Sequence, residues 1–460
     1  MKNINLGKKE VVHFIGIGGI GMSGLAQIMK ISGFNVQGSD VALNKNIENC
    51  KKIGIKIFIG HSKKNINKAT IIVKSSAIKN NNQEIKFSRK KKIPIYERAE
   101  ILADIVSLKK NIVVTGSHGK TTTTSLIAKI LSDAKLDPTI INGGVINSIK
   151  NNAKMGKGEW SVLEADESDG SFLKFPVHYS IVTNIDYEHL DFYKNFNNLK
   201  NAFIKFINRT PSIGKNFICL DDKYLKKIKN KVKNKNISTF GFHKESNYRI
   251  LNVKYQENKT SFDIITKKKL IGRFSTNLLG THNVLNTAAA ISLCLNIGIK
   301  VNVIKKSLLN FSGVQRRMTK VFSRDNQSFY DDYAHHPTEI VSVLDSVKKV
   351  NKKNDVIAIF QPHRFSRVKK LYSKFCRSFF SSDKVILCPV YPAGEKIDKK
   401  FDIIKFAKKI GKYSKVQVIV INNYIELMNY FKKNQSNKQI IIGMGAGSIS
   451  KWILDLKEDL

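Results

Sequence analysis

The sequence has few cysteines, and no long run of apolar residues. Its five cysteines are dispersed through 460 residues, with no CxxC pair and no metal-ligand spacing: Cys50, Cys219, Cys294, Cys376 and Cys388. A scattered, odd-numbered set indicates reduced thiols. No stretch approaches the roughly 18 uncharged apolar residues of a membrane span, and the N-terminus MKNINLGKKEVV has no signal-peptide core. We therefore expect a cytoplasmic protein with no membrane insertion.

Acidic residues and arginine are also scarce. The chain has 36 acidic residues against 79 basic ones, a net charge of +43, and only 11 of the basic residues are arginine. Such a charge can indicate a nucleic-acid-binding protein. Here the lysines are spread among Asn and Ile, and no basic patch is interleaved with aromatics. We interpret the charge as mainly compositional and expect no specific nucleic-acid partner; a polyanion-binding surface is the alternative.

Short apolar strands alternate with helical patterns along almost the whole chain. This pattern predicts an α/β fold with mostly parallel sheets. Strand series begin at VVHFIGI, NIVVTGS and SFYDDYA, so we expect three domains, at residues 1–107, 108–313 and 314–460. The first and third are predicted to be Rossmann-like, and the central one a P-loop ATPase-like parallel sheet. Residues 223–259 are interpreted as a lysine-rich insertion without an assigned role.

A first glycine loop, in HFIGIGGIGMSGLA, follows a predicted strand and opens a helix. It contains GxGxxG at Gly16, Gly18 and Gly21. Such a loop directs backbone N–H groups and a helix N-terminus at a diphosphate. Asp40 ends the next strand, where a ribose-binding acid is expected. Taken alone, the motif fits an NAD site, a nucleotide-sugar site or a structural turn.

A second glycine loop lies in VVTGSHGKTTTT, again between a strand and a helix. Its backbone N–H groups can cradle an anion, with Lys120 on the phosphates and Thr121 on Mg²⁺. The full P-loop pattern needs another glycine where Val114 stands. The alternative is a strand-to-helix turn capped by Ser117.

Acidic residues crowd the ends of two further strands. VLEADESDGSF contains Glu164, Asp166, Glu167 and Asp169, and TNIDYEHLDFY contains His189 among acids. Crowded carboxylates repel one another unless cations share the space, and Mg²⁺ is the usual cation beside a nucleotide loop. The alternative is a pair of acid-rich helix N-termini. We predict a magnesium site here.

The motifs occur together, in one order, in a known family. TGSHGKTTTT, EADESDGSF, TNIDYEHLDFY, LGTHNVLNTAAAI, DDYAHHPTEI and FQPHRFSR follow one another as they do in Mur ligases. With HFIGIGGIGMSGLA, the set resembles the alanine-adding branch of that family over essentially the whole chain. Mur ligases typically have the shorter phosphate loop, which accounts for Val114.

The resemblance implies an activity and its substrates. The expected reaction joins L-alanine to the carboxylate of UDP-N-acetylmuramate through an acyl phosphate, in peptidoglycan precursor synthesis. ATP and Mg²⁺ are the implied cofactors, and a monomer or weak dimer is expected. The implied contacts to the sugar nucleotide are Gly16, Gly18, Gly19, Gly21, Ser39, Asp40, His61 and Ser75.

The resemblance also assigns residues to ATP and the metal. The implied ATP contacts are Gly116, Ser117, His118, Gly119, Lys120, Thr121, Thr122, His282, Asn283, Asn286 and Asp332. Side-chain amides suit adenine because they both donate and accept, although LGTHNVLN also fits an ordinary packed helix. The implied metal ligands are Thr121, Glu164 and His189.

The amino acid is expected in the third domain, at Tyr333, His335, Arg364 and Arg367. The guanidinium fork suits a carboxylate; ordinary surface arginines are the alternative. The implied catalytic residues are Lys120, Glu164, His189 and His335, and the base that deprotonates the amine stays open between His335 and a water.

Other functions account for fewer of these motifs. Sibling ligases, such as the tripeptide-recycling enzyme or a folylpolyglutamate synthase, share the central motifs, but the second lacks the GIGGIGMSG domain. A nicotinamide-dependent oxidoreductase leaves the TGSHGKTT loop and the acidic clusters unexplained. A nucleic-acid-binding ATPase predicts steeply salt-dependent polyanion binding.

Overall fold

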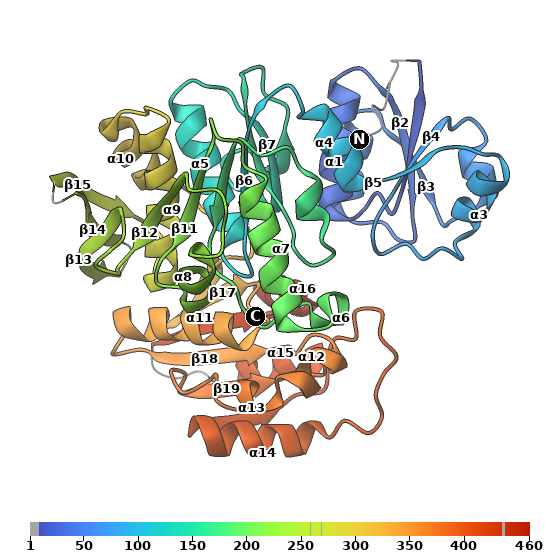
Figure 1. Cartoon of the computed structure of the whole chain (residues 1–460). Coiled ribbons are helices and arrows are strands. Elements are labelled where there is room, and N and C mark those ends of the chain that lie inside the picture. Colours follow the sequence, from blue (N-terminus) through green and yellow to red (C-terminus); the bar gives the residue numbers. More distant parts are fainter. Residues whose placement is uncertain (1–8, 258, 268, 435–437) are drawn as a thin grey trace. The chain divides into compact units, whose positions relative to one another are not determined.

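The computed structural model of the chain describes residues 9–257, 259–267, 269–434 and 438–460 (Figure 1). It is a three-domain α/β architecture with predominantly parallel strands, as the strand pattern predicted. Two compact units divide the chain. The first comprises Met1–Asn252, Phe262–Ser275 and Leu285–Ser312, and the second Val253–Ser261, Thr276–Val284 and Gly313–Leu460. The predicted domain boundaries near residues 108 and 313 remain a prediction.

The first sheet is parallel, in the order β3-β2-β1-β4-β5. Its strands are β1 (Val11–Ile15), β2 (Asn35–Asp40), β3 (Lys56–Ile59), β4 (Ile71–Lys74) and β5 (Ile95–Glu97). The helices α1 (Ile20–Ile31), α2 (Lys45–Lys52) and α3 (Gln83–Lys90) lie between these strands, and α4 (Arg98–Ile105) follows β5. The strand order reverses beside β1, which is the position where doubly wound sheets bind ligands. The Rossmann-like prediction is confirmed.

The second sheet has the order β15-β14-β13-β12-β11-β10-β6-β9-β7-β8. The six strands from β11 to the β8 edge are β6 (Lys110–Thr115), β7 (Thr139–Ile146), β8 (Asn151–Lys154), β9 (Trp160–Glu164), β10 (Tyr179–Val182) and β11 (Lys215–Cys219). β6 pairs in parallel with β9 on one side and β10 on the other. Helix α5 (Lys120–Asp133) follows β6 directly. The loop after β6 is thus flanked by the carboxyl ends of β9 and β10.

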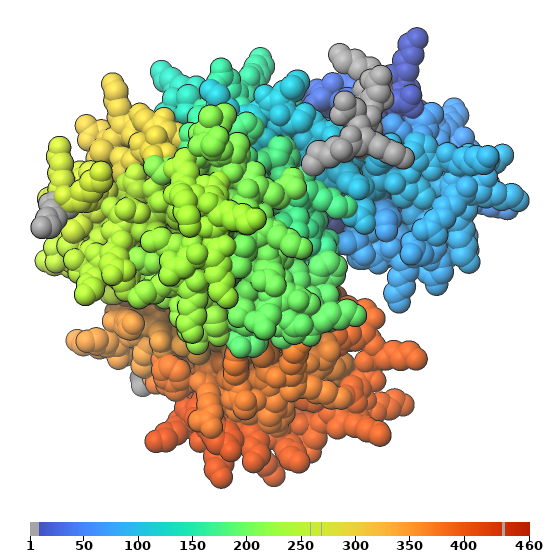
Figure 2. Space-filling model, viewed as in Figure 1, coloured from blue at the N-terminus to red at the C-terminus, as the bar shows by residue number. Residues whose placement is uncertain are grey.

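The described part of the segment 223–259 contributes strands to this sheet, so its interpretation as an insertion was wrong. It forms α8 (Lys223–Lys229), β12 (Ile237–Gly241) and β13 (Tyr248–Gln256), and the chain continues into β14 (Lys259–Thr266) and β15 (Lys269–Thr276). In β13 the exposed Asn252, Lys254 and Gln256 alternate with half-buried apolar residues. This two-residue period was hidden by the polar composition. In the space-filling view the segment is continuous with the rest of this part of the surface (Figure 2).

The third sheet has the order β16-β17-β21-β18-β19-β20. Its strands are β16 (Thr319–Arg324), β17 (Gln327–Asp332), β18 (Asp355–Phe360), β19 (Lys384–Leu387), β20 (Gln417–Val420) and β21 (Gln439–Met444). Among the described pairings of this third sheet, only β16 runs antiparallel to its neighbour, and the sequence pattern did not predict this strand. Helices of this sheet include α11 (Pro337–Val350), α12 (Phe365–Lys370), α14 (Ile403–Ser414) and α16 (Ile449–Asp459). Within the described ranges, every helix is too short or too polar to cross a bilayer.

Phe360 tests the packing of this third sheet. It is fully buried at the end of β18, in aromatic contact with Phe375 and Phe379. We expect Phe360→Ala to lower the free energy of unfolding by about 3–5 kcal/mol, because it leaves a cavity. Phe380→Ala is the control, since Phe380 is 58% exposed, and it should change stability by less than about 0.5 kcal/mol. Equal urea midpoints for the two variants would contradict this packing.

Candidate functional site

The loop after β6 has the backbone of an anion cradle. Gly116 has φ +133° and Gly119, which caps α5, has φ +82°. A side chain at these positions would collide with Thr183 and Asn286 respectively. The loop is fixed by Asn184, whose Oδ1 accepts from the His118 N–H at 2.8 Å and whose Nδ2 donates to the His118 carbonyl at 3.0 Å. The free N–H groups at the start of α5 remain directed outward from the helix end.

Lys120 is held back against this loop. Its Nζ donates to the Gly116 carbonyl at 2.6 Å, the Ser117 carbonyl at 3.2 Å and Glu167 Oε2 at 2.8 Å. Burial alone disfavours the charged amine, but Glu167, Asp166 and Glu164 outweigh it, so the pKa of Lys120 is raised. The side chain is therefore a permanent cation beside the anion cradle.

The structure divides the predicted metal ligands between two places. Thr121 Oγ1 donates to Glu164 Oε1 at 3.0 Å, and the Gly143 N–H donates to Glu164 Oε2 at 2.6 Å. His189 instead faces Glu167, with Nε2 3.5 Å from Oε1. Burial lowers the pKa of His189, but this ion pair raises it more. Potential ligand atoms of Asp166, Glu167 and His189 lie within 4.8 Å of one another.

Glu167 is the residue of this group that the sequence left without a role. It is fully buried, and its Oε1 accepts no hydrogen bond. Burying such an oxygen is costly unless a donor or cation faces it. Carboxylate oxygens are the ligands that Mg²⁺ prefers, so the residues present fit divalent cations beside both Glu164 and Glu167. The crowding in EADESD was the sequence signal, but it did not say which acid was buried.

The amide residues lie at the start of α9 (Thr281–Asn296). Asn286 packs against Gly119, so this side chain reaches the anion cradle. Asn283 Nδ2 donates to the Leu279 carbonyl at 2.8 Å, at the helix start. His282 lies one turn before Asn286 on the same helix. The adenine contacts of these residues stay predictions.

The first glycine loop is held by the acid at the end of β2. The Gly16 and Ile17 N–H groups donate to the Ser39 carbonyl, and Gly18 N–H donates to Asp40 Oδ2 at 2.7 Å. Gly16 has φ +81° and packs against Ser75. The Ser39 hydroxyl, by contrast, is fully buried and donates to Glu84 Oε2 at 2.6 Å. Ser39 and His61 therefore contact a buried carboxylate that the sequence did not single out.

Gly19 and Gly21 mark the start of α1 beside this loop. Gly19 is the N-cap residue of the helix. Gly21 faces Arg98, so that a side chain there would press against the guanidinium. The helix N-terminus therefore opens directly from the loop, as a diphosphate site needs. Direct contacts of these residues with a sugar nucleotide stay predictions.

The residues predicted to bind the amino-acid substrate lie in the second unit. The Arg316 guanidinium lies over the Tyr333 ring, with its Cζ 4.7 Å from the ring centroid. The His335 ring is 5.7 Å from that of His363, and Arg367 NH1 is 3.0 Å from His363 Nδ1. His363 lies in the quoted motif FQPHRFSR, yet the sequence did not mark it as a site residue.

In the described part of the chain, Arg364 and Asp332 have no hydrogen bond to this histidine cluster. Arg364 is exposed and precedes α12 with φ +67°, so its part in a carboxylate clamp remains a prediction. Asp332 accepts from the Met318 and Ala334 N–H groups, both at 2.8 Å. Burial raises the pKa of Asp332 to about 6 despite the opposing charge of Arg317.

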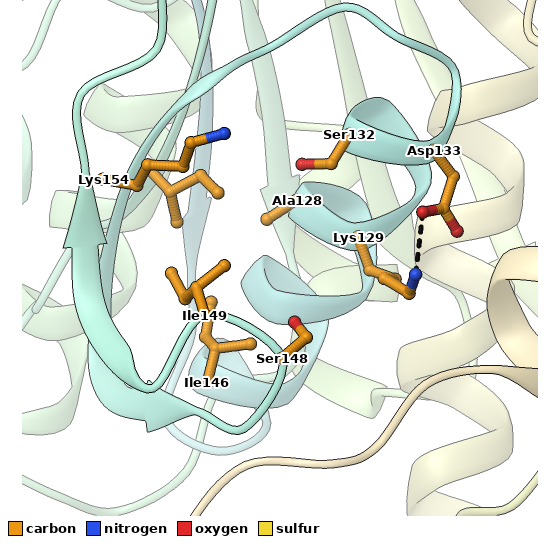
Figure 3. Close-up of a pocket in the computed structure, with 9 residues that line it drawn as sticks. Ala128, Lys129, Ser132, Asp133, Ile146, Ser148, Ile149 and Lys154 are labelled. Carbon is orange, nitrogen blue, oxygen red and sulfur yellow. Dashed lines mark hydrogen bonds and ion pairs between the residues drawn. The ribbon is translucent and has the colours of Figure 1, made fainter.

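One hollow in the surface lies apart from all the predicted site residues (Figure 3). It lies between the later turns of α5 and the β7–β8 hairpin. Its lining combines isoleucines with Lys129, Asp133 and Lys154. Because Lys129 is paired with Asp133 at 2.7 Å, the polar groups do not converge on the hollow, and we assign it no catalytic role.

Comparisons with known proteins agree with this geometry. Sequence profiles described as Mur ligase family catalytic domain, Mur ligase middle domain and Mur ligase glutamate ligase domain match residues 11–110, 114–294 and 316–447. The chain is 57% identical to the UDP-N-acetylmuramate–L-alanine ligase of Pelagibacter ubique, over 99% of both chains. The solved structure of UDP-N-acetylmuramate-alanine ligase MurC from Thermotoga maritima has a TM-score of 0.84 and 28% identity, covering 97% of this chain and 98% of that one.

A murein peptide ligase from Psychrobacter arcticus is more distant. Its structure has a TM-score of 0.73 and 21% identity, covering 98% of both chains. At this identity the likeness is one of fold alone.

Gly119 offers a test of the cradle. Gly119→Ala should weaken nucleotide binding, because the new methyl group collides with Asn286. The alanine must also adopt a left-handed backbone conformation, which is strained. Gly298→Ala is the matched control: its φ is +91°, but nothing lies within 4 Å of its added carbon. Each variant should lose about 1–2 kcal/mol of stability from the backbone. Nucleotide affinity, measured by calorimetry, should fall only for Gly119→Ala; equal losses would contradict the contact.

The histidines of the second unit give a pH test. Burial lowers the pKa of His335 to about 3, and burial with Arg367 lowers that of His363 to about 4. Neither ring should titrate in an NMR experiment above about pH 5. Because the unfolded chain takes up these protons at higher pH than the folded one, the stability of this unit should fall as pH drops below about 6.5. A His335 midpoint near neutrality would contradict the burial.

Proposed function

The chain belongs to the Mur ligase family, and we propose that it joins L-alanine to UDP-N-acetylmuramate at the expense of ATP. The full-length identity to a ligase of this name supports the proposal. The structural observation that carries it is the Lys120 cation beside a glycine cradle, with Glu167 bound to Lys120 and Glu164 bound to Thr121. This arrangement suits phosphoryl transfer to an anionic acceptor.

The first step would activate the sugar-nucleotide acid. A carboxylate oxygen is a poor leaving group, so the muramoyl carboxylate attacks the γ-phosphorus of ATP and gives an acyl phosphate plus ADP. Both reactants are negative, and the reaction needs positive charge where they meet. Lys120 and the N–H groups of the loop supply that charge. Mg²⁺, when bound, would neutralise phosphate oxygens from the sides of Thr121–Glu164 and Glu167–His189.

Lys120 must change partners for this step. Its amine is bound to Glu167 and to two loop carbonyls. A phosphate in the cradle offers the amine a stronger partner. When the Lys120 amine moves to the phosphate, Glu167 becomes available to a metal cation. Nucleotide binding and metal binding therefore favour each other.

The second step would form the amide. The alanine amine attacks the acyl carbonyl, and phosphate leaves from the tetrahedral intermediate. We assign Arg364 and Arg367 to the alanine carboxylate and Tyr333 to the wall of its pocket. His335 has a pKa of about 3, whereas an α-ammonium has one of roughly 8. His335 is therefore too weak a base to take that proton. We assign the proton to a bound water and, as the amide forms, to the departing phosphate, and we assign His335 to orienting the amine as a hydrogen-bond acceptor.

The proposal further places the nucleotide and the sugar nucleotide at separate loops. ATP would occupy the loop from Gly116 to Thr122, with adenine near His282, Asn283 and Asn286 and its ribose near Asp332. UDP-N-acetylmuramate would place its diphosphate on the loop from Gly16 to Gly21. In this scheme Ser117 and His118 contribute backbone groups, because Ser117 Oγ already accepts from the Asp186 N–H at 2.8 Å.

A phosphate-release assay tests this function. Release should require ATP, UDP-N-acetylmuramate and L-alanine together. Phosphate release with the recycled tripeptide in place of L-alanine would instead assign the activity of a murein peptide ligase. Release without a sugar nucleotide would remove the ligase assignment altogether.

Lys120→Ala tests the assigned cation. We expect kcat to fall by at least about 100-fold, because charge stabilisation in the transition state is lost, while the affinity for UDP-N-acetylmuramate is kept. The control is Lys129→Ala on the same helix, whose amine pairs with Asp133. That variant should turn over normally. Normal turnover by Lys120→Ala would contradict the assignment.

A further inference from the structure

A buried carboxylate in the first domain is not used by the mechanism above. Glu84, in the first turn of α3, is fully buried. Its Oε2 accepts from Ser39 Oγ at 2.6 Å and lies 3.0 Å from His61 Nδ1. Its Oε1 accepts from Asn65 Nδ2 at 2.8 Å. Acids in a first helical turn are usually exposed, so a buried one with converging donors needs a reason beyond the helix dipole.

The hydrogen bonds determine the tautomer of His61. The pKa of Glu84 is about 2: burial alone would raise it, but the facing His13 ring and the hydrogen bonds from Ser39 and Asn65 lower it more. An ionised carboxylate only accepts, so the proton of the facing nitrogen must be on His61 Nδ1. In the neutral ring Nε2 then carries a lone pair. The His61 side chain is 15% exposed, and among the described residues its hydrogen bonds are all made by Nδ1.

A second histidine next to Glu84 has the opposite arrangement. Gln37 Nε2 lies 3.2 Å from His13 Nδ1 and 2.9 Å from the Asn65 carbonyl. An amide N–H donates, so His13 Nδ1 accepts and its proton is on Nε2, which faces Glu84 Oε1 at 3.7 Å. His13 is fully buried and cannot meet a ligand. Of the two rings, only His61 reaches the surface.

His61 lies at the edge where a nucleotide would be bound. β1, β2 and β3 are successive neighbours, and His61 follows β3 closely. The loop after β1 is the diphosphate site of the proposed function, and the end of β2 is the ribose position in such folds. A nucleotide extended along this edge brings its base to the end of β3.

We propose that Glu84 is a positioning residue that keeps His61 in the Nδ1–H tautomer, so that Nε2 accepts from the imide N–H of uracil and selects uridine over cytidine nucleotides. This inference rests on the proposed function, because it takes a uridine nucleotide as the substrate. Cytosine has an acceptor at the equivalent ring nitrogen, so two lone pairs would face each other. A site built to bond one donor discriminates strongly against an analogue that lacks it.

The first measurement reads the tautomer in the unsubstituted protein. In full-length protein labelled with nitrogen-15 histidine, the His61 resonances are assigned by their loss in His61→Gln. The expected spectrum is that of the Nδ1–H tautomer. An Nε2–H tautomer in the unsubstituted protein would overturn the inference.

The second measurement uses Glu84→Gln, which keeps the shape but offers His61 a donor as well as an acceptor. By calorimetry we expect UDP affinity and the preference for UDP over CDP each to fall about tenfold, with a change of the His61 tautomer. Glu48→Gln is the control, an exposed acid in the first turn of α2, and should change neither. A folded Glu84→Gln protein with the original preference and tautomer would overturn the inference.

The two proposals fail differently. If the unsubstituted protein binds neither UDP nor UDP-N-acetylmuramate, the proposed function and this inference fall together. If it binds both and Glu84→Gln binds them equally well, only the role of Glu84 is overturned.

Discussion

The ion pair between Lys120 and Glu167 is the interaction on which the rest of the candidate site depends. Four carboxylates follow one buried strand, and such crowding is unfavourable without cations. In this structure the Lys120 amine, at 2.8 Å, is the cation that holds Glu167. The same amine is the group that a phosphate in the cradle would attract. One lysine therefore compensates the acids before binding and the phosphates afterwards, which links the architecture of the loop to its chemistry.

The two glycine loops share one arrangement of strand, helix and hydrogen-bonding side chain. Each follows a strand that has parallel neighbours on both sides and opens a helix, and each is held by a polar residue at or just after the end of a neighbouring strand. Asp40 accepts from the Gly18 N–H in the first domain, and Asn184 binds both backbone groups of His118 in the central one. Because these side chains satisfy backbone groups of the loop, the helix N–H groups are left for a ligand. The family relationship gives this arrangement its ligands; the hydrogen bonds explain why the loops hold their shape.

Much of this could be predicted from the sequence, because strands and glycine loops are local features. The alternating apolar runs predicted the parallel sheets, and the motif order predicted the family. Strand β13 was missed because its exposed positions carry Lys, Asn and Gln, which hid the period of two. Glu84 was missed for another reason, and Glu167 was named among the crowded acids without its burial being predicted. Which of several acids is buried depends on side chains brought from distant segments, such as Lys120 or Ser39 and His61, and no local pattern records those partners.

The central claim is that Lys120 leaves Glu167 for a phosphate while divalent cations take up the acids. A crystal of the full chain grown with Mn²⁺ and a non-hydrolysable ATP analogue tests it most directly, since manganese is located by its anomalous scattering. The account predicts one manganese beside Thr121 and Glu164, a second beside Glu167 and His189, and the Lys120 amine on a phosphate oxygen. An analogue bound with Lys120 still on Glu167, and no manganese beside that carboxylate, would contradict the account.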